Sequence, residues 1–405
     1  MSLSPARPLA YYAAFFTTAW LRRIVTYVAV VYGYEMLGGG MWSGIFYLCL
    51  VLPYLVSLYA GSVIDAASKR AVLRVTATLS IGLLGLMALV EHQHWLGAGP
   101  AHGWLMAALL GAFGIVTAFN YPAFFAVIPD LVERSALGRT TALANVLGML
   151  CYACGPLTAG VLHAYVSWPG IFAVLTGLAV GARLLLGLVP LPAHAAPRAP
   201  AGSEWARLRE LGAYCRDHRI LLALLVASGV FGGIVVGPLE VLAPLYAQDP
   251  LHCSPLLAGI FIATGGLGLL AGAISALWLV DRGHLGAWLC GSGVAGGLLL
   301  VAMTFVPLPV AFGLFFLGGF LGGVFNSLSI AAIQSHAPDA LRGRVLGLFS
   351  LIIGAIPALG GLASGALIEA AGTVTTMRVA FGAVVVAFAL LYFLQPALRK
   401  ESPNS

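Results

Sequence analysis

The sequence predicts an all-α membrane protein, with twelve transmembrane helices arranged as two pseudo-symmetric six-helix bundles. Of its 405 residues, 60% are hydrophobic and only 8% are charged, and the mean hydropathy is +0.99. A soluble globular protein carries about 25% charged residues, so this composition is typical of an integral membrane protein. Apolar runs of about 20 residues, each long enough to cross a bilayer as a helix, recur twelve times. The second half of the chain repeats features of the first, which divides the helices into two sets of six.

The apolar runs set the boundaries that we expect for the helices. In the first half, the predicted spans are 9–34, 42–63, 72–91, 103–126, 140–163 and 168–190. In the second half, they are 220–246, 256–280, 285–305, 309–332, 345–368 and 376–396. The first run is too long for a cleavable signal peptide, and it contains two arginines, so we interpret it as a membrane span.

Lysine and arginine are concentrated in every second loop and in the C-terminal tail. These cations are Lys69, Arg70, Arg134, Arg139, Arg282, Arg342, Arg344, Arg399 and Lys400. The positive-inside rule then places both termini in the cytoplasm, in a multi-pass protein of the inner membrane. The net charge of +6 is explained by these loop cations and does not indicate nucleic-acid binding.

The composition changes between the sixth and the seventh apolar run. Pro192 to Gly202 is rich in proline and alanine, which suits an extended linker. Ser203 to Arg219 has the mixed apolar and charged spacing of an amphipathic helix, and we favour a position on the membrane surface for it. We therefore expect an N-terminal bundle at 1–191, a cytoplasmic linker at 192–219 and a C-terminal bundle at 220–405.

Matching motifs support the internal repeat. Each half carries a Phe-Asn pair followed by a Pro-Asp pair at the start of a cytoplasmic loop, and further residues match at a single shift. The matched pairs are Phe119-Asn120 with Phe325-Asn326, Pro129-Asp130 with Pro338-Asp339, Arg139 with Arg344, and Gly160 with Gly365.

The loop after the second run reads Gly61-Ser-Val-Ile-Asp65-Ala-Ala-Ser-Lys69-Arg70. This spacing resembles the loop between helices 2 and 3 of the major facilitator superfamily, whose architecture is a parallel repeat of six helices. The resemblance implies a latch between the two halves on the cytoplasmic side. The gating residues would be Gly61, Asp65, Lys69, Arg70, Arg139 and Arg344. An ordinary loop with positive-inside charges is the alternative.

Other motifs resemble a branch of bacterial exporters that includes enterobactin-type siderophore exporters. They are Asn120-Tyr-Pro-Ala, Pro129-Asp130-Leu-Val and Gly237-Pro-Leu-Glu-Val-Leu-Ala-Pro-Leu-Tyr-Ala247. The resemblance implies secondary active export by alternating access, driven by proton antiport and without a cofactor. Nothing in the sequence indicates an enzyme, because it has neither a phosphate-binding Gly-Lys loop nor a Ser–His–Asp order in a soluble segment.

Arg22 and Arg23 lie about halfway along the first span, too far from either end to reach water. Thr18, Arg22 and Thr26 recur every four residues, so we expect Arg22 to face a central cavity. Arg23 lies about 100° around the helix and is expected to pair with another helix. Few internal acids can neutralise these cations, which favours an anionic substrate such as a carboxylate-type siderophore. Alternatively, both arginines are internal braces.

Two acids are candidates for a coupling proton. Glu35 and Glu240 lie near the outer ends of the first and seventh spans, which are equivalent in the repeat. Glu240 is the better candidate because apolar residues flank it. Further candidate substrate contacts are Asn120, Tyr121, Asn145 and Asn326, although hydrogen bonding between helices is the ordinary role of such residues.

No metal site is predicted, because His92, His94 and His102 are irregularly spaced, and Cys151 and Cys154 more plausibly pack within a helix. The expected partners are a small-molecule substrate, membrane lipids and protons, with the protein acting as a monomer. Three alternatives stay open. One is a proton-coupled multidrug exporter, whose cationic substrates need buried acids; the others are an uptake permease and a non-transporting membrane sensor.

Overall fold

The computed structural model describes residues 6–57, 68–93, 97, 99–189, 204–279, 285–338 and 341–395, and all regular elements of this part are helices. Eleven helical stretches are long and apolar enough to cross a membrane, and a shorter apolar stretch covers Gly40–Val56. The prediction of an all-α membrane protein is therefore confirmed. The count of twelve spans is not fully confirmed, because the second predicted span, 42–63, continues into residues outside the described part.

The described part of the first half contains seven α-helices and two short 3₁₀ turns. They are α1 (Ala6–Leu37), α2 (Gly40–Val51), η1 (Leu52–Val56), α4 (Lys69–Gln93), α5 (Pro100–Ala118), α6 (Asn120–Leu131), η2 (Arg134–Ala136), α7 (Leu137–Tyr165) and α8 (Trp168–Leu188). The fourth predicted span, 103–126, is divided into α5 and α6 by a turn at Phe119. The other described boundaries lie within a few residues of the predicted ones.

The second half is preceded by α9 (Glu204–Asp217), at the place where an amphipathic helix is predicted. Its elements are α10 (Arg219–Val230), η3 (Phe231–Val236), α11 (Gly237–Gln248), α12 (Pro255–Leu279), α13 (Leu285–Ala302), η5 (Met303–Phe305), α14 (Leu308–His336), α15 (Arg342–Ala355), α16 (Pro357–Ala371) and α17 (Thr373–Leu394).

Two predicted spans of the second half are interrupted at prolines. A π-helical segment, η3, precedes Pro238 in the seventh span, and α15 gives way to α16 just before Pro357 in the eleventh. Proline has no N–H to donate and its ring displaces the carbonyl four residues earlier, so the helix widens or breaks there. The two interruptions pack together: a Cβ added at Gly233 would lie 3.1 Å from Ile356 Cγ2.

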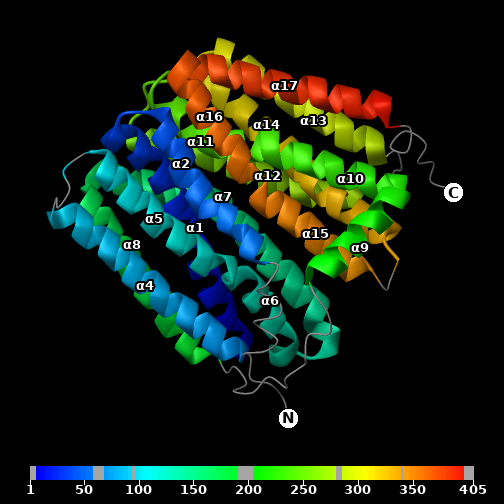
Figure 1. Cartoon of the computed structure of the whole chain (residues 1–405), viewed down its shortest axis with the longest axis horizontal. Coiled ribbons are helices and arrows are strands. Elements are labelled where there is room, and N and C mark those ends of the chain that lie inside the picture. Colours follow the sequence, from blue (N-terminus) through cyan, green and yellow to red (C-terminus); the bar gives the residue numbers. More distant parts are fainter. Residues whose placement is uncertain are drawn as a thin grey trace.

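The helices form two groups, shown in Figure 1. In the first group, α1–α8, α4 packs on α8 and α1 packs on α7; in the second group, α10–α17, α12 and α13 both pack on α14. The groups meet along two seams, α2 against α16 and α7 against α12. The two seams are equivalent in the internal repeat. One joins the second span (α2) to the eleventh (α16) and the other joins the fifth (α7) to the eighth (α12), and the repeat relates the second span to the eighth and the fifth to the eleventh.

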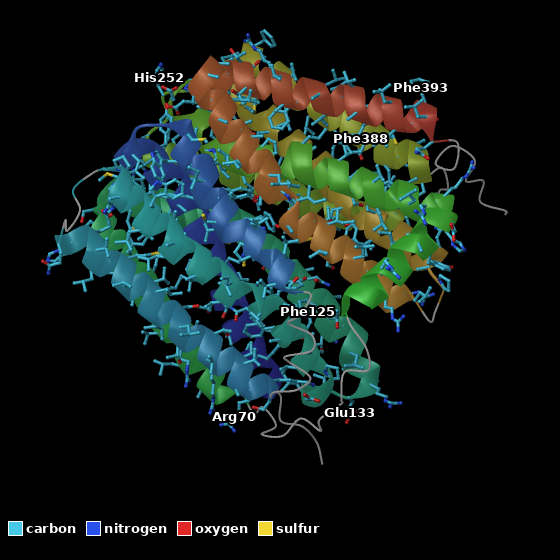
Figure 2. The ribbon with its side chains drawn as sticks, in the orientation of Figure 1. Arg70, Phe125, Glu133, His252, Phe388 and Phe393 are labelled. Carbon is cyan, nitrogen blue, oxygen red and sulfur yellow. The ribbon has the colours of Figure 1, made fainter. Side chains whose placement is uncertain are left out.

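Glycines bring the backbones together in both seams. A Cβ added at Gly160 would lie 2.8 Å from Gly259 Cα, and one added at Gly44 would lie 3.2 Å from Gly365 Cα. Such small residues let helices approach closely within a membrane. These contacts lie toward the end of the molecule that carries His252, which we call the His252 end; Arg70 and Glu133 lie at the opposite end (Figure 2).

We expect Gly160→Ala to destabilise the folded protein by about 1–3 kcal/mol, because the new methyl group has no room in the α7–α12 seam. The control is Gly177→Ala in α8, where a Cβ meets nothing within 4 Å. That change should stabilise the protein by about 0.5–1 kcal/mol, since alanine favours a helix over glycine. The unfolding temperatures of the purified variants decide the matter; a rise for both would contradict the tight seam.

Candidate functional site

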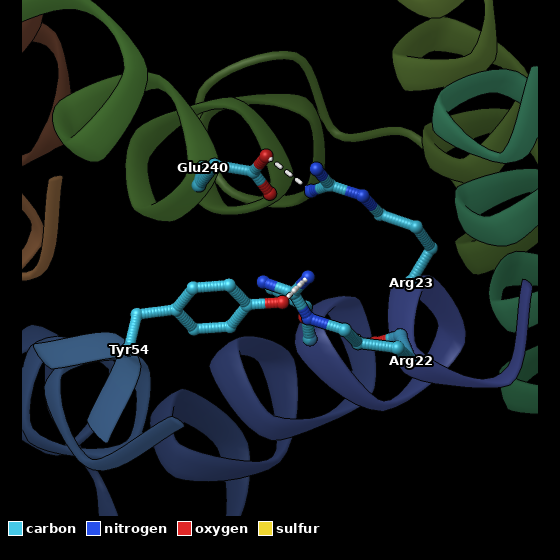
Figure 3. A network of polar contacts seen from close by, with 5 residues as sticks. Arg22, Arg23, Tyr54 and Glu240 are labelled. Atoms are coloured by element: carbon cyan, nitrogen blue, oxygen red, sulfur yellow. Dashed lines mark hydrogen bonds and ion pairs between the residues drawn. The ribbon is translucent and has the colours of Figure 1, made fainter. Parts of the chain in front are cut away.

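The candidate site is built on the middle of α1, where two consecutive arginines point in different directions. Helix α1 packs against α2, α7 and α8 and also contacts α11 of the second group. Because successive helix residues are about 100° apart, Arg22 and Arg23 reach different neighbours. Figure 3 shows Arg22 directed toward Tyr54 and Arg23 directed toward Glu240.

Arg23 joins the two groups of helices through an ion pair. Its Nη1 lies 2.7 Å from Glu240 Oε1 on α11, and the two side chains are 17% and 23% exposed. The guanidinium also lies 3.3 Å from the ring centroid of Tyr152 on α7, a cation–π contact. Gly155 leaves the space that the Arg23 side chain occupies against α7. The charge of Arg23 is therefore neutralised inside the protein by an acid of the second group.

This pairing differs from the sequence-based expectation that few acids are in reach of the arginines. Glu240 was expected near the outer end of its span, away from the middle of α1. The structure instead places the Glu240 carboxylate beside the Arg23 guanidinium, where α11 contacts α1. The expectation that Arg23 pairs with another helix agrees with this geometry.

Arg22 has no acidic partner among the described residues. Its Nη1 donates a hydrogen bond to the Tyr54 hydroxyl, and its guanidinium lies 4.3 Å from the Tyr54 ring centroid. The Tyr54 ring in turn contacts the second group, because a Cβ added at Gly354 would lie 3.0 Å from its Cδ1. Arg22 is thus held by a neutral aromatic side chain and keeps its full positive charge.

Tyrosines gather around the two arginines. The Tyr121 hydroxyl donates to Asn145 Oδ1 at 3.1 Å, and both side chains are exposed. Tyr121 interacts electrostatically with Tyr152, Tyr54 and Arg22, so these groups share one region between the helices. The site therefore offers a cation, aromatic faces and hydroxyl or amide groups to a small molecule.

Four other predicted contacts lie elsewhere. Thr18 and Asn120 line a small cavity inside the first group, together with residues of α4 and α8. The hydroxyls of Thr18 and Thr26 donate to backbone carbonyls one turn earlier in α1, so neither hydroxyl contacts Tyr54, the partner of Arg22. Asn326 is half-buried on α14. No side-chain hydrogen bond links it to Arg22, Arg23, Tyr54, Tyr152 and Glu240, which we call the arginine cluster.

Glu35, the second acid predicted to carry a proton, lies at the His252 end. Its Oε2 is 3.0 Å from His163 Nε2 on α7, and His163 Nδ1 is 3.5 Å from Gln248 Nε2 of the second group. Glu35 therefore belongs to a polar contact between the two groups and not to the arginine cluster.

The predicted gating residues are only partly within the described residues. Gly61 and Asp65 lie outside them. Lys69 Nζ is 2.8 Å from Asp130 Oδ2, and this ion pair lies inside the first group rather than across the two halves. Arg139 and Arg344 are exposed at the ends of α7 and α15.

Sequence reasoning missed several polar residues that the structure brings together. Tyr54 and Tyr152 carry the cation–π contacts, yet tyrosine in an apolar run gives no signal of its own. A second set, Tyr32, Glu91 and His102, forms a buried cluster; Glu91 was interpreted as the end of a span. Within the described ranges, no group of three metal-ligating side chains could hold a metal ion.

Comparison with known proteins identifies similar chains. The sequence matches the model of the Major Facilitator Superfamily over residues 9–313 and 288–405. It is 28% identical to the multidrug efflux pump Tap of Mycobacterium tuberculosis, over 86% of this chain and 84% of the pump. It is 27% identical to the enterobactin exporter EntS of Citrobacter koseri, over 83% of this chain and 78% of the exporter.

Two further similarities agree with these matches. The staphyloferrin A transporter of Staphylococcus aureus is 22% identical, over 90% of each chain. A crystal structure of the nucleoside transporter NupG superposes with a TM-score of 0.74 at 14% identity, covering 99% of this chain and 100% of that one. At that identity the likeness to NupG shows a shared fold alone.

Proposed function

The chain belongs to the Major Facilitator Superfamily, and from this premise we propose that it exports a small anionic molecule by proton-coupled alternating access. A carboxylate-type siderophore is the substrate class that we favour. The observation that carries the proposal is the position of Arg22, a cation in the middle of α1 whose partner is the neutral Tyr54.

The free-energy cost of such a cation supports a functional role. A charged side chain at the bilayer centre costs about 2.5–3.5 kcal/mol on insertion scales, and it is usually offset by an opposite charge. Here the described residues supply no acid to Arg22, whereas Arg23 beside it has Glu240. A carboxylate on the substrate would neutralise the charge of Arg22 and accept two parallel, charge-assisted hydrogen bonds from its guanidinium. An exporter named for enterobactin and a transporter named for staphyloferrin A, both among the relatives, agree with a siderophore substrate.

The Arg23–Glu240 pair is the proposed link to protons. A proton on Glu240 removes the charge that holds Arg23, and so weakens a bond between the two groups of helices. Separation of these groups at the His252 end is the movement that alternating access requires. Protonation of Glu240 and separation of the two groups of helices would therefore both break the Arg23–Glu240 ion pair, which links proton binding to the movement.

The orientation follows from the loop cations. If the cation-rich loops face the cytoplasm, as the positive-inside rule requires, the His252 end faces outward and both termini are cytoplasmic. The glycine seams then close the protein toward the outside, and a cytoplasmic anion would reach Arg22 from within. We further propose an inner-membrane location, a monomer, and two six-helix bundles joined by the linker at 192–219.

A second candidate is a proton-coupled multidrug exporter. Glu240 favours it, because a cationic drug could take the place of Arg23 at the carboxylate. The similarity to the multidrug efflux pump Tap agrees with this alternative.

The test compares metabolites in cells that contain the wild-type protein, no protein, or an equal amount of the Arg22→Ala variant. We expect an anionic metabolite to be retained in the cytoplasm and depleted from the medium in the second and third strains. An unchanged metabolite profile, together with increased sensitivity of the deletion strain to cationic drugs, would support the multidrug alternative and reject anion export.

A further inference from the structure

Three polar side chains meet in the interior of the first group, away from the arginine cluster. Glu91 of α4 and His102 of α5 are 3% and 6% exposed, and His102 Nε2 lies 2.6 Å from Glu91 Oε1. The Tyr32 hydroxyl of α1 donates to the same carboxylate oxygen and lies 2.7 Å from His102 Nε2. The three polar atoms therefore form a closed triangle, the Tyr32–Glu91–His102 cluster.

The charge of this cluster depends on one proton. With Glu91 ionised and His102 neutral, the cluster carries one negative charge, and no lysine or arginine of the described residues forms an ion pair with it. One added proton makes it neutral, either as a carboxylic acid beside a neutral imidazole or as a carboxylate–imidazolium pair. Burial disfavours an uncompensated charge, so the proton-loaded form suits the buried position. In the described residues His102 Nδ1 is buried without a hydrogen-bond partner, which disfavours an imidazolium, because its Nδ1–H would have no acceptor.

The groups around the cluster are aromatic rather than charged. Tyr32 packs on Trp168 and Phe172 of α8 and on Phe46 of α2, with ring centroids 5.0, 5.7 and 6.2 Å apart. The other titratable groups nearby are His92, exposed beside Glu91 on α4, and the Glu35–His163 pair beyond Trp168. The cluster is thus insulated from other charges.

The aromatic residues around the cluster also touch residues that connect the two groups of helices at two places. Trp168 lies 4.9 Å from the ring of His163, which approaches Gln248 of the second group. Phe46 belongs to α2, which packs against α16 through its glycines. Admitting water to a charged cluster would disturb these aromatic contacts and hence the closed His252 end.

From this geometry we infer that the Tyr32–Glu91–His102 cluster is a second proton-binding site, distinct from Glu240, whose bound proton stabilises closure of the His252 end. The inference does not depend on which substrate Arg22 binds. Loss of the proton leaves an uncompensated buried charge, which is relieved when the end opens and water enters.

Cys253 provides a native reporter of this opening. It lies in the loop after α11, is 8% exposed and interacts electrostatically with Tyr27 of the first group. Burial raises the pKa of its thiol, so opening should speed its alkylation. The protein for the test is the full chain with the other five cysteines (Cys49, Cys151, Cys154, Cys215 and Cys290) replaced by alanine.

The experiment measures labelling of Cys253 by a maleimide between about pH 5 and pH 8, in nanodiscs, with and without Glu91→Gln. The ordinary effect of pH on the thiol is common to both proteins. We expect the labelling rate of the wild type, divided by that of Glu91→Gln, to rise by about tenfold from the low to the high end of the range. Only the wild-type cluster can lose its proton and so open the His252 end. Glu133→Gln, which changes an exposed acid at the opposite end of the molecule, is the control and should follow the wild-type curve.

Two further variants keep the test decisive if Glu91→Gln does not fold. Tyr32→Phe removes one hydrogen-bond donor to the carboxylate and should change the pH response relative to the wild type. His102→Gln should remove the response or displace it. Parallel curves for the wild type and every folded cluster variant would overturn the inference, whatever the result at Glu240.

Discussion

Replacing Glu240 by glutamine is expected to abolish transport driven by a pH gradient while preserving exchange of labelled for unlabelled substrate. Glutamine keeps the shape of the side chain and can still accept a hydrogen bond from Arg23, but it binds no proton in the physiological range. The contact that joins α1 to α11 loses its charge attraction, and Arg23 keeps a hydrogen bond to a neutral amide and its contact with Tyr152. We expect a change of about 1–3 kcal/mol in the balance between the two conformations, or roughly 5–150-fold.

The measurement uses purified protein in liposomes with an imposed pH gradient, and the same vesicles at equal pH for exchange. Glu35→Gln is the matched control, because it makes the same change in an acid that pairs with His163 at the His252 end. It should retain proton-driven transport. Full gradient-driven transport by the Glu240→Gln protein would remove Glu240 from proton coupling.

The proposed role of Glu240 as the proton carrier also sets how protons and substrate would affect each other's binding. An anion that displaced Glu240 from Arg23 would leave a bare carboxylate and so favour its protonation; the proton and the anion would then bind together. A cation that displaced Arg23 from Glu240 would instead compete with the proton. Proton-driven export of an anion therefore fits best when Arg22 holds the substrate and Arg23–Glu240 is left for the proton.

If Arg22 holds the substrate and Glu240 the proton, the affinity for each class of substrate should depend on pH in a different way. A cationic drug at Glu240 should bind more weakly as pH falls and Glu240 gains a proton. An anion held by Arg22 should bind equally well at every pH, because Arg22 contacts Tyr54 and takes no part in the Arg23–Glu240 pair. The two proposed functions thus differ in whether a single binding curve depends on pH.

The fold could be predicted from the sequence because its cause is local. Twenty apolar residues between charged loops form a membrane helix wherever they occur, so eleven of the predicted spans agree with the described helices within a few residues, while the second continues outside the described part. The repeat also carried information about packing. Gly160 and Gly365, matched by position in the sequence, occupy equivalent places in the two seams, where only glycine allows the backbones to touch.

The site could be predicted only in part because its contacts depend on tertiary geometry. The sequence singled out Arg22, Arg23 and Glu240 by the cost of charge in an apolar run. It could not show that α11 packs against α1 so that Glu240 pairs with Arg23. Glu91 was overlooked for a similar reason: at the end of a run it is typical of a solvated acid, yet α5 buries it against His102.

Replacing Arg22 by lysine or alanine tests the anion site directly. Lysine keeps the charge but loses the planar pair of donors, so a carboxylate should bind more weakly than to the wild type. Alanine removes both, and we expect a further loss; charge-assisted hydrogen bonds contribute about 1.5–3 kcal/mol, or roughly 10–150-fold in affinity. Affinity is measured in nanodiscs at matched folding, with the siderophore-type anion and with a cationic drug.

The cationic drug is the internal control for these variants. Removing a positive charge from the site should leave its affinity unchanged or improve it, whereas a general disturbance of the site would weaken both ligands. Tyr54→Phe is the matched structural control, because it removes the hydroxyl that Arg22 contacts and leaves the guanidinium and the aromatic ring in place. If the anion binds equally well to the wild type, Arg22→Lys and Arg22→Ala, then Arg22 is a brace for Tyr54 and the multidrug alternative gains support. Graded loss for the anion alone, in the order wild type, lysine, alanine, assigns the substrate's negative charge to Arg22.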